Sequence, residues 1–455
     1  MPGSLVGERD SPFEQGAPMK VLILTHGTRG DVQPYAALAL ALNRAGHEAV
    51  LAAPAAMAGL AGPHGIVFAP LHDGPNTLID DPGIRQAIET NYRGLRGKMV
   101  ALRVMRRSKP LMAEVFADMA DVAVDGDGQG ADLVVHAPGM PGRHIAERLG
   151  VPAVPAALQP IWVPTAAFRN PMLPVPLPKV LNRASYLPIK LMLRSFAGIA
   201  DDLRTRLDLP RRRGRHDILR RPDGGPATVL HAFSRHLLPH DTPGGLDYPA
   251  WVHTTGFWHL PAPPDWTPSP ELAAFLADGP PPVYIGFGSM AGTDPLRLGR
   301  IVAEAVRRAG VRAVLATGWG GIEAADLPDG VHLLDQAPHD WLLPRMAAIV
   351  HHGGSGTTAA ALLAGRPQVI CPFVADQPFW AARAHAAGVA VPPQPQRRLT
   401  PDGLAAAIRL AATDTRMATT AADLGRRVRA ENGLDRAVTI LEDHTKDGAR
   451  GQSRL

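Results

Sequence analysis

A glycine-rich turn and an acid–amide pair in the C-terminal third of the chain contain the side chains best suited to chemistry. After an apolar run, the chain reads His351-His352-Gly353-Gly354-Ser355-Gly356-Thr357-Thr358 and continues as a helix of small residues. Free backbone N–H groups and the helix dipole at such a start favour an anion such as a diphosphate. A second apolar run leads to Asp376 and Gln377, which suit hydrogen bonds to sugar hydroxyls. Together the two parts predict a nucleotide-sugar site.

The two adjacent histidines of this turn cannot act together on one ligand. Neighbouring side chains on a strand point to opposite faces, so His351 and His352 cannot both bind one metal ion, and we predict no metal site. We expect His352, next to the glycines, to face the ligand. The alternative is a core histidine whose ring nitrogens are satisfied by neighbouring groups.

A second glycine-rich turn, Gly286-Phe287-Gly288-Ser289-Met290-Ala291, fits the dinucleotide-binding fingerprint. That fingerprint also requires an acid near the end of the next strand to hold a ribose. Here the next strand runs into Ala316-Thr317-Gly318 and offers no acid. The glycines therefore favour close approach of the backbone to a phosphate, with Ser289 as a donor.

Asp31 lies in the first turn between a strand and a helix, Gly27-Thr28-Arg29-Gly30-Asp31. Ligands bind parallel sheets at the carboxyl ends of their strands, where this turn is expected. Asp31 could be the N-cap of the following helix, or a general base that takes a proton from an attacking hydroxyl. The residues alone leave both interpretations open, and the nearby His26 competes for the role of base.

The positions of apolar residues predict two cycles of strand and helix. Residues 20–25, 49–53, 132–136 and 151–155 are typical of buried parallel strands, and Pro34 is expected to open a helix that stops at Gly46. A second cycle begins with a strand over 283–287, a helix over 295–309 and strands over 312–316 and 331–334. The predicted fold class is α/β, with two Rossmann-like, doubly wound domains facing across a cleft.

These cycles set the predicted domain boundaries. We expect a disordered leader over 1–18, an N-terminal acceptor-binding domain over 19–240 and an interdomain linker rich in Pro, Trp and Gly over 241–281. A C-terminal nucleotide-sugar domain over 282–442 and a disordered polar tail over 443–455 complete the chain.

Composition narrows the class of protein. The 455 residues are 45% hydrophobic and 20% charged, as in a soluble globular protein of two or three domains. Cys371 is the only cysteine, which excludes an intrachain disulfide and is compatible with a cytoplasmic location. No long apolar run predicts a transmembrane span, and residues 1–18 lack the apolar core of a signal peptide. Aromatic residues are too few, at 5%, to favour nucleic-acid binding despite a net charge of +5.

Two irregular segments have open interpretations. Residues 152–178 contain eight prolines among apolar residues, which suits either a surface connector or an apolar loop beside an acceptor pocket. Residues 204–221 contain eight arginines, which are typical of a solvated face. Peripheral contact of that segment with a membrane surface stays open.

Several of these motifs, in this order, resemble those of the inverting nucleotide-sugar glycosyltransferases with the two-domain GT-B fold. The likeness is to sterol glucosyltransferases and bacterial glycosyltransferases of antibiotic aglycones. It covers about residues 20–430, through the turn at 27–34, the segments 286–290, 337–341 and 351–358, and the pair at 376–377.

The resemblance implies a role for each matched residue. Asp31 matches the catalytic base, and backbone at Ala337, Pro338 and His339 matches the part that pairs with a pyrimidine. Asp376 and Gln377 match the grip on sugar hydroxyls. The remaining donor contacts match the diphosphate cradle, namely Ser289, His352, Gly354, Ser355, Gly356 and Thr357. The implied reaction moves a hexose or deoxyhexose from a UDP- or dTDP-sugar to a hydroxyl of a lipophilic small molecule, without metal or other cofactor, in a monomer or homodimer.

One position departs from the family pattern. Plant relatives have a glutamate eight residues after the motif histidine that holds both ribose hydroxyls, whereas this chain has Ala360. The choice between UDP- and dTDP-sugars therefore stays open. Plant relatives also have a histidine where Asp31 stands. Two other functions remain as alternatives: a nucleotide-sugar epimerase, and a non-catalytic protein that binds a nucleotide sugar.

Overall fold

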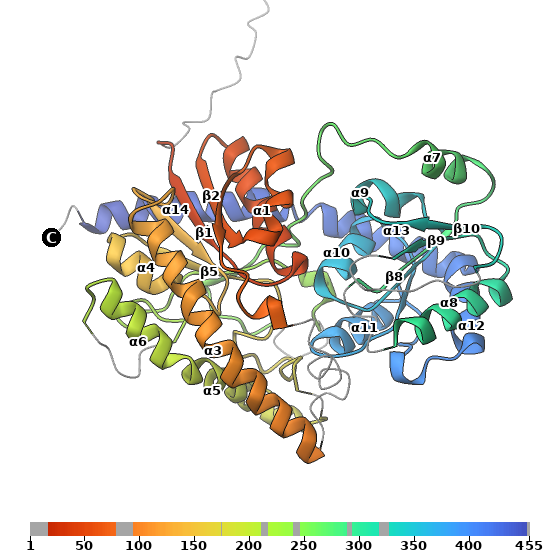
Figure 1. The fold of residues 1–455 in the computed structure, drawn as a ribbon, viewed down its shortest axis with the longest axis horizontal. Helices are drawn as coiled ribbons and strands as arrows, with labels where there is room; N and C mark the ends of the chain where they lie inside the picture. Colours follow the sequence, from red (N-terminus) through yellow and green to blue (C-terminus); the bar gives the residue numbers. More distant parts are fainter. Residues whose placement is uncertain are drawn as a thin grey trace, which may run out of the picture.

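The computed structural model describes residues 17–78, 94–173, 175–210, 217–239, 246–288, 294–317 and 327–452. Residues 1–16 of the predicted leader over 1–18, Ser289, and residues 453–455 of the predicted tail lie outside these ranges. Within them the chain forms two α/β lobes side by side, and the final blue helix lies on the first of them (Figure 1).

The first lobe contains one parallel sheet in the order β3-β2-β1-β4-β5-β6-β7. Both of its faces are covered, so its inner strands consist almost entirely of buried residues, most of them apolar, as expected for parallel strands, whereas the edge strands β3 and β7 are more exposed. The strands are β1 (Lys20–Leu24), β2 (Glu48–Pro54), β3 (Val67–Leu71), β4 (Leu133–His136), β5 (Ala153–Ala157), β6 (Val229–His231) and β7 (Val252–Thr254).

Helices cover the first sheet on both faces. Helix α1 (Arg29–Arg44) packs into one core cluster, and α3 (Gly94–Val124) with α4 (Gly142–Leu149) into another. Helices α5 (Leu187–Ser195) and α6 (Ala197–Arg206) follow. Helix α1 begins at Arg29, before the predicted start at Pro34, because Thr28 and Asp31 form a capping box that starts the helix a turn earlier.

The second lobe contains a smaller parallel sheet in the order β10-β9-β8-β11-β12. Its strands are β8 (Val283–Gly286), β9 (Ala313–Ala316), β10 (Val331–Leu334), β11 (Ile349–His351) and β12 (Gln368–Ile370). Its helices are α7 (Pro270–Ala277), α8 (Pro295–Ala309), α9 (His339–Leu342), α10 (Ser355–Leu363), α11 (Gln377–Ala386), α12 (Pro401–Thr413) and α13 (Thr415–Arg429). The prediction of two doubly wound parallel-sheet domains is confirmed.

The predicted linker over 241–281 is largely built into the two lobes. Strand β7 is the edge strand of the first sheet, paired in parallel with β6. Leu272 of α7 is buried in the core of the second lobe. The chain therefore passes from the first lobe to the second between β7 and α7. Each of these elements packs on a surface that the sequence pattern alone does not reveal.

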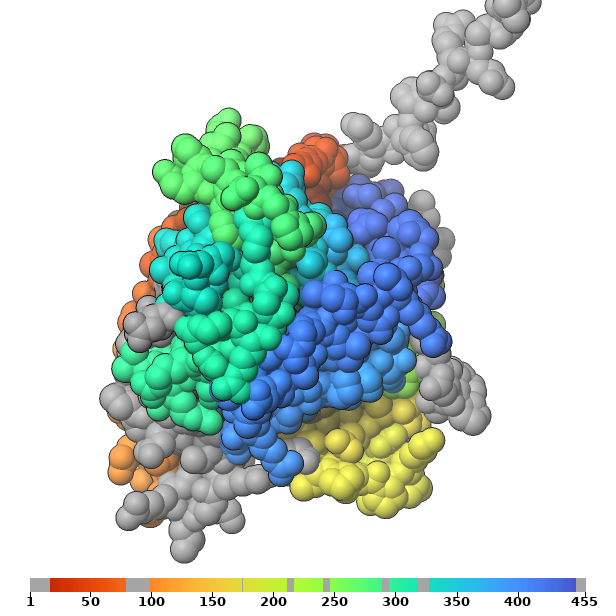
Figure 2. Space-filling model, turned by 90° about the vertical axis from the view of Figure 1, so that its right-hand side faces the viewer, coloured from red at the N-terminus to blue at the C-terminus, as the bar shows by residue number. Residues whose placement is uncertain are grey.

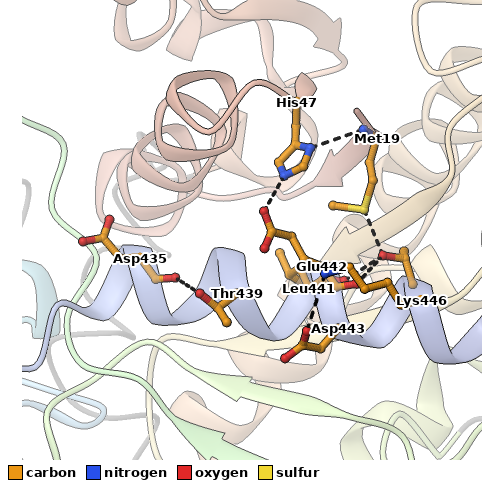
Figure 3. Close-up of polar contacts among 9 residues, drawn as sticks. Met19, His47, Asp435, Thr439, Leu441, Glu442, Asp443 and Lys446 are labelled. Carbon is orange, nitrogen blue, oxygen red and sulfur yellow. Dashed lines mark hydrogen bonds and ion pairs between the residues drawn. The ribbon is translucent and has the colours of Figure 1, made fainter. Parts of the chain in front are cut away.

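The final helix, α14 (Gly433–Gln452), returns to the first lobe and corrects the prediction of a disordered tail after residue 442. Ala437, Val438 and Leu441 are buried in the core that also contains α1. Polar contacts continue beyond them (Figure 3): Glu442 lies 3.0 Å from the ring of His47, and the Thr445 hydroxyl lies 2.9 Å from the sulfur of Met19. These contacts keep the polar end of the helix on the first lobe.

Candidate active site

The sequence-predicted residues collect where the carboxyl ends of the two sheets face each other. Asp31 follows β1 in the first lobe, whereas His352 follows β11 and Asp376 follows β12 in the second. Helices α1 and α10 contact each other across the junction. In Figure 1 the start of α1 faces α10, as this contact requires. The junction therefore joins one residue group from each lobe into a single candidate site.

The start of α10 is built to receive an anion. Gly354 is the N-cap residue, and no side chain in the described ranges caps the helix. The backbone N–H groups of its first turn, at Ser355, Gly356 and Thr357, belong to the set that an α-helix leaves without an intrahelical partner. These N–H groups and the helix dipole favour a phosphate at this point.

His352 lies between the two glycine-rich turns. A Cβ atom added to Gly354 would lie 2.5 Å from Nε2 of His352, and one added to Gly288 would lie 3.6 Å from its Cε1. The imidazole thus touches both turns, which explains the need for glycine at 354. Burial lowers the pKa of His352 to about 4, so the ring is neutral and carries one N–H near neutral pH. Its Nδ1 is buried without a hydrogen-bond partner among the described residues.

His351 has a structural role and is fully buried. The Gly353 N–H donates to its Nδ1 over 3.1 Å, so the ring proton is on Nε2, which donates to Gln368 Oε1 over 3.0 Å. Burial lowers the pKa of His351 to about 3, and both of its ring nitrogens are satisfied. The structure thus places only His352 of this pair at the junction.

Asp376 stands at the N-cap position of α11. The indole N–H of Trp380 donates to its Oδ2 over 2.8 Å. Burial, with a smaller contribution from the negative charge of Asp31, raises the pKa of Asp376 to about 6. The preceding Ala375 adopts a left-handed conformation with φ of 57°, which is strained for a residue with a Cβ and turns the chain toward the junction.

The Gln377 side chain is partly committed to its own loop. Its Oε1 accepts from the N–H groups of Phe373 over 2.7 Å and Val374 over 3.1 Å. Only its amide NH2 group is left for a ligand. The predicted acid–amide pair therefore offers one acceptor, from Asp376, and one donor.

Asp31 is the third residue of α1, and Thr28 is the N-cap residue, so the N-cap interpretation of Asp31 is wrong. Its Oδ2 accepts from the backbone N–H of Thr28 over 2.9 Å and from the Thr28 hydroxyl over 3.0 Å. A Cβ atom on Gly27, whose φ is 136°, would lie 2.5 Å from this oxygen. Burial outweighs the two hydrogen bonds and raises the pKa of Asp31 above its ordinary value.

His26 is a weaker candidate than Asp31 for the general base. Its Nε2 lies 3.2 Å from the carbonyl oxygen of His72, to which it donates. Burial lowers the pKa of His26 below its ordinary value. Of the two candidate bases, Asp31 is the one whose charge contributes to the raised pKa of Asp376 in the other lobe.

The structure adds two residues that the sequence reasoning missed. Arg29 lies at the start of α1 and its Nη1 is 3.5 Å from Oε1 of Gln336 in the second lobe. Tyr284 lies 3.4 Å, hydroxyl to Nε2, from His339. Burial and the charge of Arg29 lower the pKa of His339 to about 4. A cation two residues before Asp31 in a glycine-rich turn was the available signal for Arg29.

The remaining predicted residues divide into two groups. Ala337, Pro338 and His339 lead into α9 beside Tyr284 and are only partly buried. Ser289 lies outside the described residues.

In the ranges that the structure describes, no cluster of three histidine, cysteine, aspartate or glutamate side chains could hold a metal ion. None of the helices described there is long and apolar enough to cross a membrane.

Comparison with known proteins identifies the two halves of the chain. Residues 21–166 match the model of the glycosyltransferase family 28 N-terminal domain. Residues 314–440 match that of the erythromycin biosynthesis protein CIII-like C-terminal domain. An O-mycaminosyltylonolide 6-deoxyallosyltransferase of Streptomyces fradiae is 36% identical, over 93% of this chain and 97% of that protein.

Other relatives and solved structures agree with this match. A sterol 3-beta-glucosyltransferase of Emericella nidulans is 34% identical over 94% of this chain, which spans 30% of that relative's length. The glycosyltransferase of kitacinnamycin has the same fold, with a TM-score of 0.65, 19% identity and coverage of 94% of this chain and 98% of that one.

The fold and the matched sequences define a glycosyltransferase with the GT-B arrangement of two Rossmann-like domains. The chain belongs to the family that joins a glycosyltransferase 28 N-terminal domain to an erythromycin CIII-like C-terminal domain, and it is a hexosyltransferase.

Proposed function

We propose that this enzyme transfers a hexose or deoxyhexose from a UDP- or dTDP-sugar to a hydroxyl of a lipophilic small molecule, with inversion at the anomeric carbon. The observation that carries the proposal is the contact between α1 and α10, which joins the lobes at the carboxyl ends of both sheets. Asp31 of α1 then faces the junction from one lobe, and His352 and Asp376 face it from the other, as one-step transfer between two bound substrates requires.

Asp31 is the proposed general base. Its Oδ2 is held by Thr28, so the other oxygen can take the acceptor proton without breaking the capping box. The acceptor oxygen attacks the anomeric carbon, the bond from that carbon to the diphosphate breaks, and the proton passes to Asp31. Burial raises the pKa of Asp31, and a carboxylate with a raised pKa is a stronger base.

The leaving diphosphate is proposed to rest on the start of α10. The N–H groups of its first turn and the single N–H of neutral His352 donate to the negative charge that develops as the glycosidic bond breaks. Ser289 is assigned as a further donor from the other glycine-rich turn. Arg29 adds a cation that reaches this junction from the first lobe.

Donor recognition uses the remaining residues of the second lobe. Asp376 accepts from sugar hydroxyls and the Gln377 amide donates to them, while backbone at 337–339 pairs with the pyrimidine. Ala360 is buried in α10 and offers no carboxylate to a ribose 2′-hydroxyl. A dTDP-sugar has no such hydroxyl, so both nucleotides are retained as candidate donors.

The acceptor class is inferred from relatives. The matched enzymes are named for O-mycaminosyltylonolide and for sterols, both bulky and largely apolar. In this chain the proline-rich segment after β5 brings Phe168 into an apolar cluster shared by both lobes. This cluster packs the proline-rich segment against the second lobe.

Product formation tests the proposal. Purified enzyme is offered UDP-glucose or dTDP-glucose with sterol, macrolide and aromatic polyketide acceptors, and products are identified by mass spectrometry and NMR. The expected result is a gain of one hexose with an anomeric configuration opposite to that of the donor. Retained configuration would contradict the inverting mechanism. Sugar turnover without acceptor would favour an epimerase, and consumption of neither donor would contradict the proposed donor class.

A further inference from the structure

Exposed apolar side chains gather on one edge of the first lobe. Of the fourteen large hydrophobic residues exposed in the described part of the chain, ten lie in two segments. We call these ten the apolar edge: Met99, Leu102, Met105, Met172, Val175, Val180, Leu181, Leu187, Leu191 and Met192.

Helix α5 and the first half of α3 leave large apolar residues exposed. Helix α5 reads LPIKLMLRS and none of its residues is buried. In α3, Met99, Leu102 and Met105 recur at intervals of three residues and so lie on one face. The second half of α3 packs into the core through Val115 and Phe116. The first half extends beyond that core with its apolar face uncovered by the described chain.

The segments of the apolar edge occupy one end of the molecule. In Figure 1 the start of α3 and the residues around α5 lie below the sheet of the first lobe. Figure 2, turned by 90° about the same vertical axis, shows yellow residues of this region low on the molecule, beneath the blue helices. The segments of the apolar edge therefore lie at the lower end of the first lobe.

The same segments are rich in positive charge. Residues 99–112 contain four basic residues and no acid, and residues 166–196 contain five basic residues and no acid. Arg183 and Lys190 form ion pairs with Asp247 and Asp217, yet their side chains remain 64% and 44% exposed. A surface that joins uncovered leucine and methionine to many basic side chains matches the headgroup boundary of an anionic bilayer.

We propose that the apolar edge inserts into the surface of an anionic phospholipid membrane. The uncovered side chains enter the boundary between headgroups and acyl chains, and the arginines and lysines bind lipid phosphates. A bilayer fits this edge because uncovered apolar side chains lie beside basic side chains in both segments, and anionic headgroups complement that charge. The enzyme is thereby held where a lipophilic acceptor dissolves, a consequence that rests on the proposed function.

The residue directly before α5 links the apolar edge to the proposed site. Tyr186 directly precedes α5 and is buried in the apolar cluster that also contains Trp380 of the second lobe. Trp380 in turn hydrogen-bonds Asp376. This buried cluster therefore packs the chain beside α5 against the tryptophan that holds the proposed sugar-binding residue.

Vesicle sedimentation tests the proposal with the full chain. Vesicles of phosphatidylcholine alone are compared with vesicles that also contain phosphatidylglycerol, at low and high salt. We expect binding to the anionic vesicles that weakens as salt screens the charges. Absence of binding to the anionic vesicles, or equal binding to both kinds, overturns the proposal.

Exposed-residue variants separate the edge from the rest of the surface. Leu187→Gln with Leu191→Gln removes apolar contacts from a helix without buried residues, so folding is unaffected. We expect about tenfold weaker vesicle binding. The matched control is Leu296→Gln with Leu410→Gln, two leucines that are each 45% exposed on α8 and α12. Equal loss in both pairs overturns the proposal.

Charge variants and solution mass complete the test. Lys190→Glu with Arg194→Glu is expected to weaken binding to the anionic vesicles, unlike the exposed pair Arg416→Glu with Arg427→Glu on α13. If the leucine variant instead converts a dimer to a monomer in light scattering, the edge joins two copies and the membrane proposal is wrong. Transfer to a water-soluble acceptor is measured separately, so loss of transfer with vesicle binding intact contradicts only the proposed function.

Discussion

Trp380 donates its indole N–H to the Asp376 carboxylate, with Nε1 and Oδ2 2.8 Å apart. Trp380 is fully buried, and its ring centroid lies 6.3 Å from that of Phe233 and 6.4 Å from that of Phe257. Both phenylalanines come from the part of the chain that precedes the second lobe. The orientation of the proposed sugar-binding acid therefore depends on packing between the two lobes.

Trp380→Phe is expected to weaken use of the donor sugar. Phenylalanine keeps an aromatic ring in the cluster but removes the N–H that fixes Asp376. A single hydrogen bond to a carboxylate contributes about 1.5–3 kcal/mol, so we expect about a tenfold or greater fall in kcat/KM for the donor. Steady-state kinetics with varied nucleotide sugar measure the change.

Trp258→Phe is the matched control for this variant. Trp258 is also buried, and its indole N–H donates to the Thr255 hydroxyl over 3.1 Å within the first lobe. Its loss is expected to lower the free energy of unfolding without changing the KM for the donor. If both variants raise that KM equally, the effect comes from general loosening and not from the contact with Asp376.

Gly354→Ala is expected to disable the diphosphate cradle. The new Cβ would lie 2.5 Å from Nε2 of His352 and displace the imidazole. We expect a fall in kcat/KM of about 100-fold, the size of effect seen when one donor to a developing negative charge is removed. Isothermal titration with UDP and dTDP checks nucleotide binding directly. Gly198→Ala, whose Cβ would meet nothing within 4 Å, is the control, and unchanged titration of Gly354→Ala would contradict the assignment.

The enzyme is expected to lose stability steeply in mild acid. Burial lowers the pKa values of His136, His339 and His352 to about 4 and those of His231 and His351 to about 3. Each ring is neutral in the folded chain but takes a proton in the unfolded chain below pH of about 6.5. The free energy of unfolding therefore falls as the pH drops from about 6.5 toward the pKa values of the folded chain, by up to about 1.4 kcal/mol per pH unit for each histidine.

His231→Phe isolates one part of this acid sensitivity. His231 is fully buried between the rings of Phe233 and Tyr248, and its Nε2 lacks a partner among the described residues. Phenylalanine fills the same space and cannot be protonated. Urea unfolding at several pH values is expected to show a variant whose stability falls less between pH of about 6.5 and 5, by about 1–2 kcal/mol. An unchanged pH slope would show that His231 is not kept neutral by burial.

Much of the fold could be predicted because parallel strands covered on both faces are nearly continuous apolar runs. Helix α8 and strand β10 have the predicted bounds. Strand β7 and the return of α14 could not be predicted, since Val252 and Leu441 are apolar residues whose partners lie elsewhere in the chain. Local pattern does not say which lobe such residues join.

The candidate site was predicted by residue type but not by contact. Asp31 was predicted to lie in the turn before the first helix, whereas the structure makes it the third residue of α1, because its capping box with Thr28 depends on backbone conformation. Trp380 was missed because a tryptophan one turn after Asp376 has no special meaning in sequence, although spacing i to i+4 on a helix permits the contact. The commitment of the Gln377 oxygen to its loop depends on the strained turn at Ala375.

Asp31→Asn tests whether Asp31 is the general base. Asparagine retains an oxygen that can accept from Thr28, so the capping box and the start of α1 survive, but it cannot take a proton. The donor and acceptor are first identified by mass spectrometry. We then expect a fall in kcat of about 1000-fold, within the usual range for a lost general base. The Kd for the nucleotide sugar is expected to stay unchanged. Transfer by Asp31→Asn at the rate of the unmodified enzyme would contradict the account, and the catalytic base would have to be another residue.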